Sequence, residues 1–135
     1  MSTAENKQLL QQVFAEMAKG NGRALVEIMA DDVAWTVSGS AKWARTYQGK
    51  RAVIDELLKP LGKRFATPYR ATAKRILADG DCVVVESQGE ATTTDGKPYN
   101  NRYCFVFRLA GGKVREITEY MDTELVTAAI GDLSA

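Results

Sequence analysis

The residues best suited to chemistry lie near the end of the chain, in two strand-like segments at 99–109 and 113–122 joined by two glycines. A Gly-Gly pair favours a two-residue hairpin turn, because both positions adopt positive φ without steric cost. Counting back from this turn places Arg102 diagonal to Glu119, within reach of a long side chain. The sequence therefore predicts a guanidinium and a carboxylate on one face of the hairpin.

The same register gathers charged and apolar groups on that face, because side chains alternate across a strand. The predicted pairs are Val106 with Ile117, Cys104 with Glu119, and Arg102 with Met121. Such a face is typical of a pocket wall, with Glu119 as general acid or base and Arg102 orienting it or stabilising negative charge. A cross-strand ion pair at a solvated edge is the other interpretation. Asp122 is out of phase with Glu119, but a bend at the strand end would bring it to the pocket mouth.

The composition limits this chemistry. The chain has 135 residues, enough for one domain with a real core, and no histidine. Without histidine there are no Ser-His or Cys-His catalytic pairs and no His-containing zinc sites. Cys82 and Cys104 lie in apolar runs without a CxxC spacing, which predicts buried free thiols and no metal site. Proton transfer must then use Asp, Glu, Tyr, Lys or Cys.

Charge and hydropathy exclude other classes of partner. The net charge is +1 with both signs interspersed, so the sequence predicts no nucleic-acid partner, and the basic stretch at 59–75 is interpreted as solvated surface. No apolar run approaches the roughly 20 residues of a membrane span. The start, MSTAENKQLL, lacks the pattern of a signal peptide. We therefore expect a cytoplasmic protein that does not bind membranes.

Hydrophobic periodicity predicts the elements that position these residues. Apolar residues recur at helical spacing in three segments: 5–19, 23–30 and 51–61, the last ending or kinking near Pro60. Strand-like runs precede the hairpin at 33–37, 69–77 and 82–93. The segment 38–48, with Trp43 and Tyr47, is predicted to be a loop, either a lid over a cavity or a surface loop with one aromatic tucked down.

This order predicts an α+β domain over residues 1–135, a cone-shaped curved antiparallel sheet packed against three N-terminal helices. A cavity between such a sheet and its helices is where a small-molecule ligand usually binds. Trp35 and Val37 share one face of the first strand and would line that cavity, although Trp35 is also interpretable as a core aromatic.

Three phrases of the chain, at 30–35, 47–53 and 112–122, together resemble the SnoaL-like, ketosteroid-isomerase-like branch of the nuclear transport factor 2-like superfamily. The resemblance implies a cone-shaped α+β barrel and commonly a homodimer formed through the sheet. It implies no single function, because the superfamily contains isomerases, polyketide cyclases, epoxide hydrolases and subunits without catalysis.

The resemblance does not carry over the ketosteroid isomerase residues. The aspartate base corresponds to Val37, the tyrosine to Val13 or Phe14, and the second acid to Cys104, so steroid isomerisation by that mechanism is not expected. The limonene-epoxide-hydrolase-like pattern is half retained, with Arg102 in place and Glu119 near the second carboxylate. SnoaL-like cyclases use no metal or cofactor and rely on an acidic residue near the last strand.

Two classes of function follow. The first is a small cofactor-independent enzyme of isomerase, cyclase or hydrolase type, which acts on an apolar oxygenated molecule through Glu119, Arg102 and Asp122. The second is a non-catalytic small-molecule-binding or dimerisation module of the same fold. In either case the residues expected to contact the ligand are Phe14, Trp35, Val37, Trp43, Cys104, Ile117 and Met121.

Overall fold

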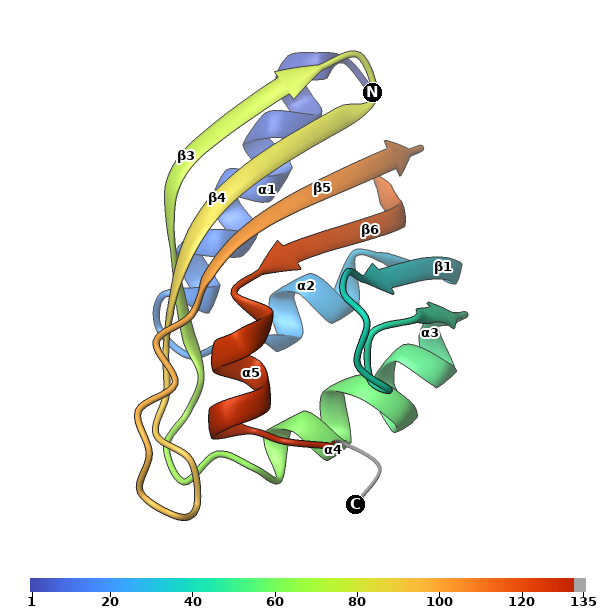
Figure 1. Cartoon of the computed structure of the whole chain (residues 1–135). Helices are drawn as coiled ribbons and strands as arrows, with labels where there is room; N and C mark the ends of the chain where they lie inside the picture. The colour runs from blue at the N-terminus through green and yellow to red at the C-terminus, as the bar shows by residue number, and fades with distance from the viewer. Residues whose placement is uncertain (133–135) are drawn as a thin grey trace.

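The structure is a computed structural model that describes residues 1–132, and it has the predicted α+β architecture (Figure 1). Its strands are β1 (Met29–Val37), β2 (Thr46–Gln48), β3 (Arg70–Asp79), β4 (Cys82–Glu90), β5 (Arg102–Ala110) and β6 (Lys113–Met121). Its helices are α1 (Thr3–Met17), α2 (Arg23–Glu27), α3 (Lys50–Ala52), the π-helix η1 (Val53–Leu58), α4 (Lys59–Gly62) and α5 (Thr123–Ala129). Within residues 1–132, no helix is both long enough and apolar enough to cross a membrane.

The six strands form one curved sheet in the order β2-β1-β6-β5-β4-β3. Strands β3 to β6 make the predicted antiparallel meander. Strand β1 joins its edge in parallel with β6, and β2 pairs with β1 in antiparallel fashion. β2 lies in the segment 38–48, which was predicted to be a loop, so that prediction is wrong for residues 46–48. A strand of three residues is too short to show an alternating hydrophobic pattern in the sequence.

Local sequence explains the helix positions. Ser2 and Glu5 form a capping box, so α1 begins two residues earlier than the periodicity predicts. Helix α1 packs on β3 and β4 and lies behind them in Figure 1. The third predicted helix is continuous from α3 to α4 and widens into a π-helix just before Pro60, whose nitrogen has no hydrogen to donate.

Three rows of side chains cross the inner face of the sheet, each made of residues directly opposite one another on neighbouring strands. The first row is Tyr47, Trp35, Ile117, Phe107 and Val83. The second row is Val37, Glu119, Phe105 and Val85. The third row is Met121, Tyr103, Ser87 and Ala73. Polarity therefore rises along the sheet, from a mainly apolar first row to a third row with two hydroxyl groups.

A β-bulge in the closing hairpin changes the predicted register. Ala110 pairs with Lys113 as expected, but the pairing shifts between Arg108 and Leu109, where β6 contains one extra residue, Arg115. Beyond the bulge Phe105, not Cys104, lies opposite Glu119. The predicted register is therefore wrong by one residue, and Cys104 and its alternate neighbours lie on the outer face. Both cysteines are free, as predicted, but half-buried rather than buried.

Candidate functional site

Glu119 is a buried carboxyl in the middle of the sheet. Its side chain is 8% exposed, and β6 holds it between β1 and β5. The indole Nε1–H of Trp35 donates a hydrogen bond to its Oε1 at 2.7 Å. Loss of solvation raises the pKa of Glu119 to about 7, although the hydrogen bond from Trp35 acts in the opposite direction. Within residues 1–132, no salt bridge pairs a lysine or arginine with this carboxyl.

Aromatic side chains enclose the carboxyl. Phe105, beside Glu119 in the second row, packs against Phe14 of α1 and against Trp35, with ring centroids 6.1 and 6.4 Å away. Tyr103 stacks on Phe105 at 5.3 Å. An apolar wall of this kind disfavours the charged form of a carboxyl and so keeps a proton exchangeable near neutral pH.

Residual solvent exposure is concentrated in the second and third rows. Tyr103 is 9% exposed and Glu119 8%, whereas Ile117 and Phe107 of the first row are completely buried. Tyr103 and Ser87 also line a hollow of about 460 Å³, together with Arg102, Cys104 and Tyr120.

Hydroxyl groups gather next to this carboxyl, and we call Tyr69, Ser87, Tyr99 and Tyr103 the hydroxyl cluster. The Tyr103 hydroxyl donates to that of Tyr99 at 2.9 Å and is also hydrogen-bonded with Tyr69. The ring of Phe65 stacks on those of Tyr69 and Tyr99, with centroids 5.7 and 5.8 Å away. Burial raises the pKa of all three phenols, and the charge of Glu119 raises it further, so they remain protonated donors.

Two residues hold the cluster in place. Asn101 is 1% exposed, and its amide nitrogen donates to the Tyr99 hydroxyl at 3.1 Å and to the Asp122 carbonyl at 3.0 Å. Its amide oxygen accepts from the backbone N–H groups of Arg102 and Asp122. Gly89 leaves the room that Tyr69 needs, because a Cβ at residue 89 would lie 2.5 Å from the Tyr69 hydroxyl oxygen.

The predicted contact between Arg102 and Glu119 does not form. Arg102 is exposed and lies with Cys104 and Tyr120 around a hollow of about 460 Å³, and these three residues belong to the outer face. The prediction that Tyr120 points away from Glu119 is confirmed, since Tyr120 is 51% exposed. The one-residue shift at Arg115 explains the exchange of faces, because every side chain beyond a register shift changes side.

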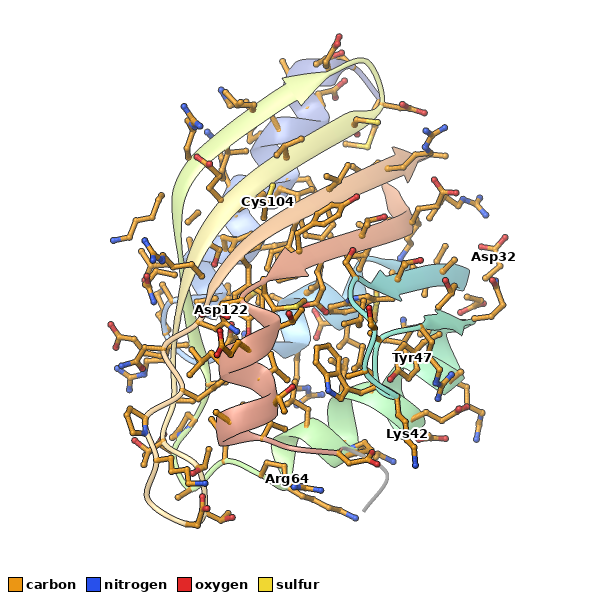
Figure 2. All side chains as sticks on the ribbon, viewed as in Figure 1. Asp32, Lys42, Tyr47, Arg64, Cys104 and Asp122 are labelled. Carbon is orange, nitrogen blue, oxygen red and sulfur yellow. The ribbon has the colours of Figure 1, made fainter. Side chains whose placement is uncertain are left out.

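Asp122 serves the fold at the end of β6. Its side chain accepts a hydrogen bond from the Leu125 N–H at 3.2 Å and so caps α5 (Figure 2). The carboxylate is exposed at the start of that helix and does not face Glu119 across a pocket. The bend that would bring it to the pocket mouth is instead the beginning of α5.

Most predicted ligand-contacting residues lie on the inner face. Phe14, Trp35, Val37 and Ile117 are buried there, and Met121 is half-buried in the third row. Trp43 is buried in the loop after β1, where its carbonyl accepts a hydrogen bond from the Tyr47 hydroxyl at 2.7 Å. Cys104 is the exception, because it lies on the outer face.

Tyr47 connects this inner face with the surface. Burial raises the pKa of the Tyr47 hydroxyl, and the guanidinium of Arg45, which acts in the opposite direction, lies 3.9 Å from the centroid of its ring. Arg45 also pairs with Glu56 at 3.0 Å. Tyr47 and Trp43 line a surface hollow of about 300 Å³. Figure 2 labels Tyr47 and Lys42 on this side of the molecule.

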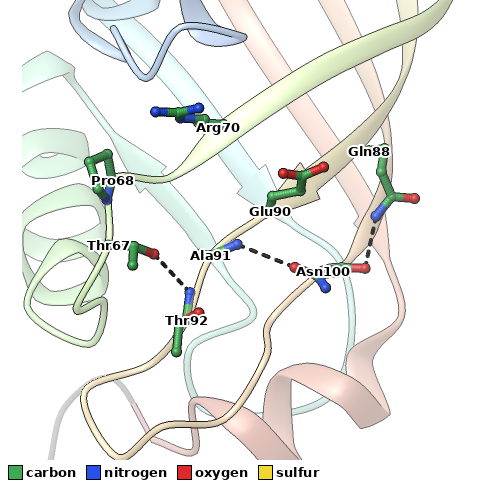
Figure 3. Close-up of a pocket in the computed structure, with 8 residues that line it drawn as sticks. All are labelled: Thr67, Pro68, Arg70, Gln88, Glu90, Ala91, Thr92 and Asn100. Atoms are coloured by element: carbon green, nitrogen blue, oxygen red, sulfur yellow. Dashed lines mark hydrogen bonds between the residues drawn. The ribbon is translucent and has the colours of Figure 1, made fainter.

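A larger polar hollow of about 550 Å³ lies where β3 begins and β4 ends (Figure 3). Arg70 and Glu90, which are cross-strand partners, line it together with Asn100. The Asn100 side-chain oxygen accepts from the Ala91 N–H at 3.4 Å. Its exposed polar lining is typical of solvated surface, and Glu119 does not take part in it.

Comparison with known proteins places the chain in a family. The chain belongs to the SnoaL-like domain family, whose model matches residues 10–117. The family predicted from its three sequence phrases is thereby confirmed. No curated protein matches the chain.

Solved structures share the fold over almost the whole chain. An NTF2-like protein from Burkholderia xenovorans LB400 is 26% identical, with a TM-score of 0.71 over 96% of this chain and 98% of that one. A protein from Jannaschia sp. CCS1 described as a candidate SnoaL-like polyketide cyclase is 18% identical, with a TM-score of 0.77 over 96% and 93%. TerC, co-crystallised with polyporic acid, is 20% identical, with a TM-score of 0.77 over 94% and 98%.

Proposed function

We propose that this protein catalyses proton transfer on an apolar, oxygenated small molecule, with Glu119 as the general acid and base. The observation that carries the proposal is the burial of this carboxyl among aromatic rings, with one hydrogen bond from Trp35 and a pKa raised to about 7. Near neutral pH both protonation states are populated, so the same group can remove a proton from one atom and return it to another.

The surroundings of Glu119 support this class of substrate. Phe14, Phe105 and Trp35 make the surroundings of the carboxyl aromatic and apolar, which suits an apolar substrate. The proposed step moves a proton only, so it requires no resident metal or redox cofactor. TerC, which shares the fold of this chain and was co-crystallised with polyporic acid, supports a small organic molecule as the ligand.

The experiment is deuterium incorporation into cyclic ketones such as 1-tetralone, followed by NMR in D₂O. We expect the wild-type protein to accelerate exchange at the carbon beside the carbonyl, with a rate that rises through about pH 7 as Glu119 loses its proton. Glu119→Gln should exchange at least about 100-fold more slowly, the usual contribution of a general base. Glu27→Gln, which alters an exposed carboxylate of α2, is the matched control. Equal rates for wild type and Glu119→Gln would rule out this role.

A non-catalytic small-molecule-binding module is the second candidate. It is favoured by surface hollows of 300 to 550 Å³ that are lined by residues other than Glu119. Thermal stabilisation of the protein by a ketone without any accelerated exchange would select this module over the enzyme.

We also propose a homodimer formed through the outer face of the sheet. An apolar row of Leu77, Val84 and Val106 crosses this face next to Tyr120, and Leu77 is 52% exposed. In Figure 1 the upper parts of β4, β5 and β6 carry no helix on the side that faces the viewer. An exposed apolar row of this kind suits a second copy of the same surface.

Tyr120→Arg is expected to raise the dimer dissociation constant at least about tenfold, because a buried aromatic anchor would be replaced by a pair of facing charges. Sedimentation velocity over a concentration series measures this change. Gln12→Arg, on the exposed side of α1, should leave the dimer intact. A wild-type protein that remains monomeric at all concentrations would contradict the dimer.

A further inference from the structure

We propose that the hydroxyl cluster is a second polar anchor for the ligand, one that binds a neutral carbonyl or hydroxyl oxygen. The ligand class is then a flat apolar molecule with an oxygen at its edge, held by Tyr69, Ser87 and Tyr103 while its ring system lies against the aromatic side chains around Glu119. This inference rests on the proposed function to the extent that both need a small molecule on the inner face.

The position of the cluster suits one ligand that reaches both anchors. Tyr103 is diagonal to Glu119 on the neighbouring strand, and Ser87 lies opposite Tyr103 on the next strand. Neighbouring strands lie about 4.8 Å apart, so Ser87 and Glu119 belong to strands roughly 10 Å apart. This span matches a molecule of about two fused rings.

The cluster has hydrogen-bonding capacity that the protein does not use. Ser87 is 3% exposed, and its Oγ has no hydrogen-bond partner within residues 1–132. The Tyr99 and Tyr103 hydroxyl groups share one hydrogen bond, which uses only one of their two hydrogens. Buried polar groups are almost always paired, and an unpaired one destabilises the fold. An oxygen from a ligand would satisfy these groups.

The fold includes specific features that keep the cluster in place. Gly89 lies one residue before the end of β4, and its missing Cβ leaves room for the Tyr69 hydroxyl. Asn101 uses both ends of its buried amide to fix Tyr99 and the backbone around Asp122. An apolar core would need neither feature, and this supports a ligand-binding role for the cluster.

The surroundings of the cluster favour a neutral oxygen over a carboxylate. No salt bridge in the described chain includes Glu119, so no cation in contact with it offsets its charge. A second carboxylate would have to lose its hydration shell close to the Glu119 charge. A ketone or a hydroxyl group can accept hydrogen bonds from the phenols without that cost.

Three probes with the same ring system test this preference: naphthalene, 2-acetylnaphthalene and 2-naphthoic acid at pH 8. Tryptophan fluorescence and calorimetry measure their dissociation constants. We expect the wild-type protein to bind the ketone about three- to tenfold more tightly than naphthalene, the usual effect of a hydrogen bond to a neutral group, and the carboxylate most weakly. The combined Tyr69→Phe and Ser87→Ala variant should bind naphthalene and the ketone equally.

Matched controls separate recognition from folding. Tyr120→Phe removes an exposed hydroxyl on the outer face and should keep the wild-type preference. Ser87→Ala removes only an unpartnered buried oxygen, so it should fold and should melt at a temperature no lower than that of the wild type. A preference for the ketone that survives in the combined variant would overturn the proposal, and so would tightest binding of 2-naphthoic acid or no binding of any probe.

The same measurements distinguish this inference from the proposed function. Loss of deuterium exchange in Glu119→Gln with an unchanged preference for the ketone supports both. A preference for the ketone without exchange in the wild type supports the anchor and contradicts the enzyme. Exchange without any preference for the ketone contradicts the anchor and leaves the catalytic role of Glu119 in place.

Discussion

Replacing Glu119 with glutamine is expected to raise the free energy of unfolding above pH 7 by up to about 3 kcal/mol. The native pKa of this carboxyl is about 7, whereas its ordinary value is 4.5. Glutamine is neutral at every pH and offers the Trp35 indole an oxygen in the same place. The variant therefore avoids the cost of burying a charge.

The sign of the pH dependence follows from the two pKa values. Below pH 4.5 the carboxyl is protonated in both states, so its burial costs nothing extra. Between pH 4.5 and 7 the unfolded chain loses this proton while the native protein keeps it, and the free energy of unfolding falls by about 1.4 kcal/mol per pH unit. Above pH 7 both states are ionised and the full loss remains.

Urea denaturation of both proteins from pH 4 to pH 8.5 measures this difference. The two stabilities should agree near pH 4 and diverge up to about pH 7, after which the gap stays constant. Glu27→Gln, an exposed change on α2, should follow the wild-type curve throughout. If the curves of wild type and Glu119→Gln run parallel from pH 4.5 to 7, Glu119 does not carry the raised pKa on which the proposed acid-base role depends.

Replacing Gly89 with alanine is expected to destabilise the protein by about 2 kcal/mol, the usual cost of overpacking a core. Its new Cβ would lie 2.5 Å from the Tyr69 hydroxyl oxygen and 3.0 Å from two carbons of that ring. The ring cannot move away easily, because it stacks on Phe65 and meets Tyr103 edge-on. In an open strand the same substitution would instead stabilise the chain.

A double-mutant cycle shows whether the Tyr69 hydroxyl causes the loss. Tyr69→Phe removes the closest atom, so Gly89→Ala should cost measurably less in that background. Gly62→Ala is the control, since nothing lies within 4 Å of its new Cβ and its backbone is helical. If Gly89→Ala lowers the free energy of unfolding equally in the wild-type and Tyr69→Phe proteins, or does not lower it at all, Gly89 is not needed to make room for the Tyr69 side chain.

Local patterns predicted the elements well. The helical spacing of 5–19 gave α1, and the two glycines at 111 and 112 adopt the positive φ values of 58° and 76° that the hairpin turn requires. Alternation placed Trp35 and Val37 on the inner face and Tyr120 on the outer face. Each of these features depends on residues close together in the sequence, so their types and spacing are sufficient.

The candidate site was only partly predictable. The hairpin pattern indicated Glu119 as a candidate acid-base group, but its predicted partner Arg102 lies on the opposite face because of the bulge at Arg115. A bulge of one residue cannot be recognised from the alternation of apolar and polar residues in the sequence. The bulged residue, Arg115, forms a hydrogen bond with Asp32, which lies 83 residues away in the sequence.

The sequence by itself determined the α+β class, the family and the closing hairpin, and it indicated Glu119 as a candidate carboxylate. Only the tertiary structure decided what surrounds that carboxylate. The parallel pairing of β1 with β6 brings the Trp35 indole to Glu119 across 84 residues, and the meander brings Tyr69, Ser87, Tyr99 and Tyr103 beside it. Burial and hydrogen bonding set the pKa of Glu119, and both arise from chain segments that meet only when the sheet has formed.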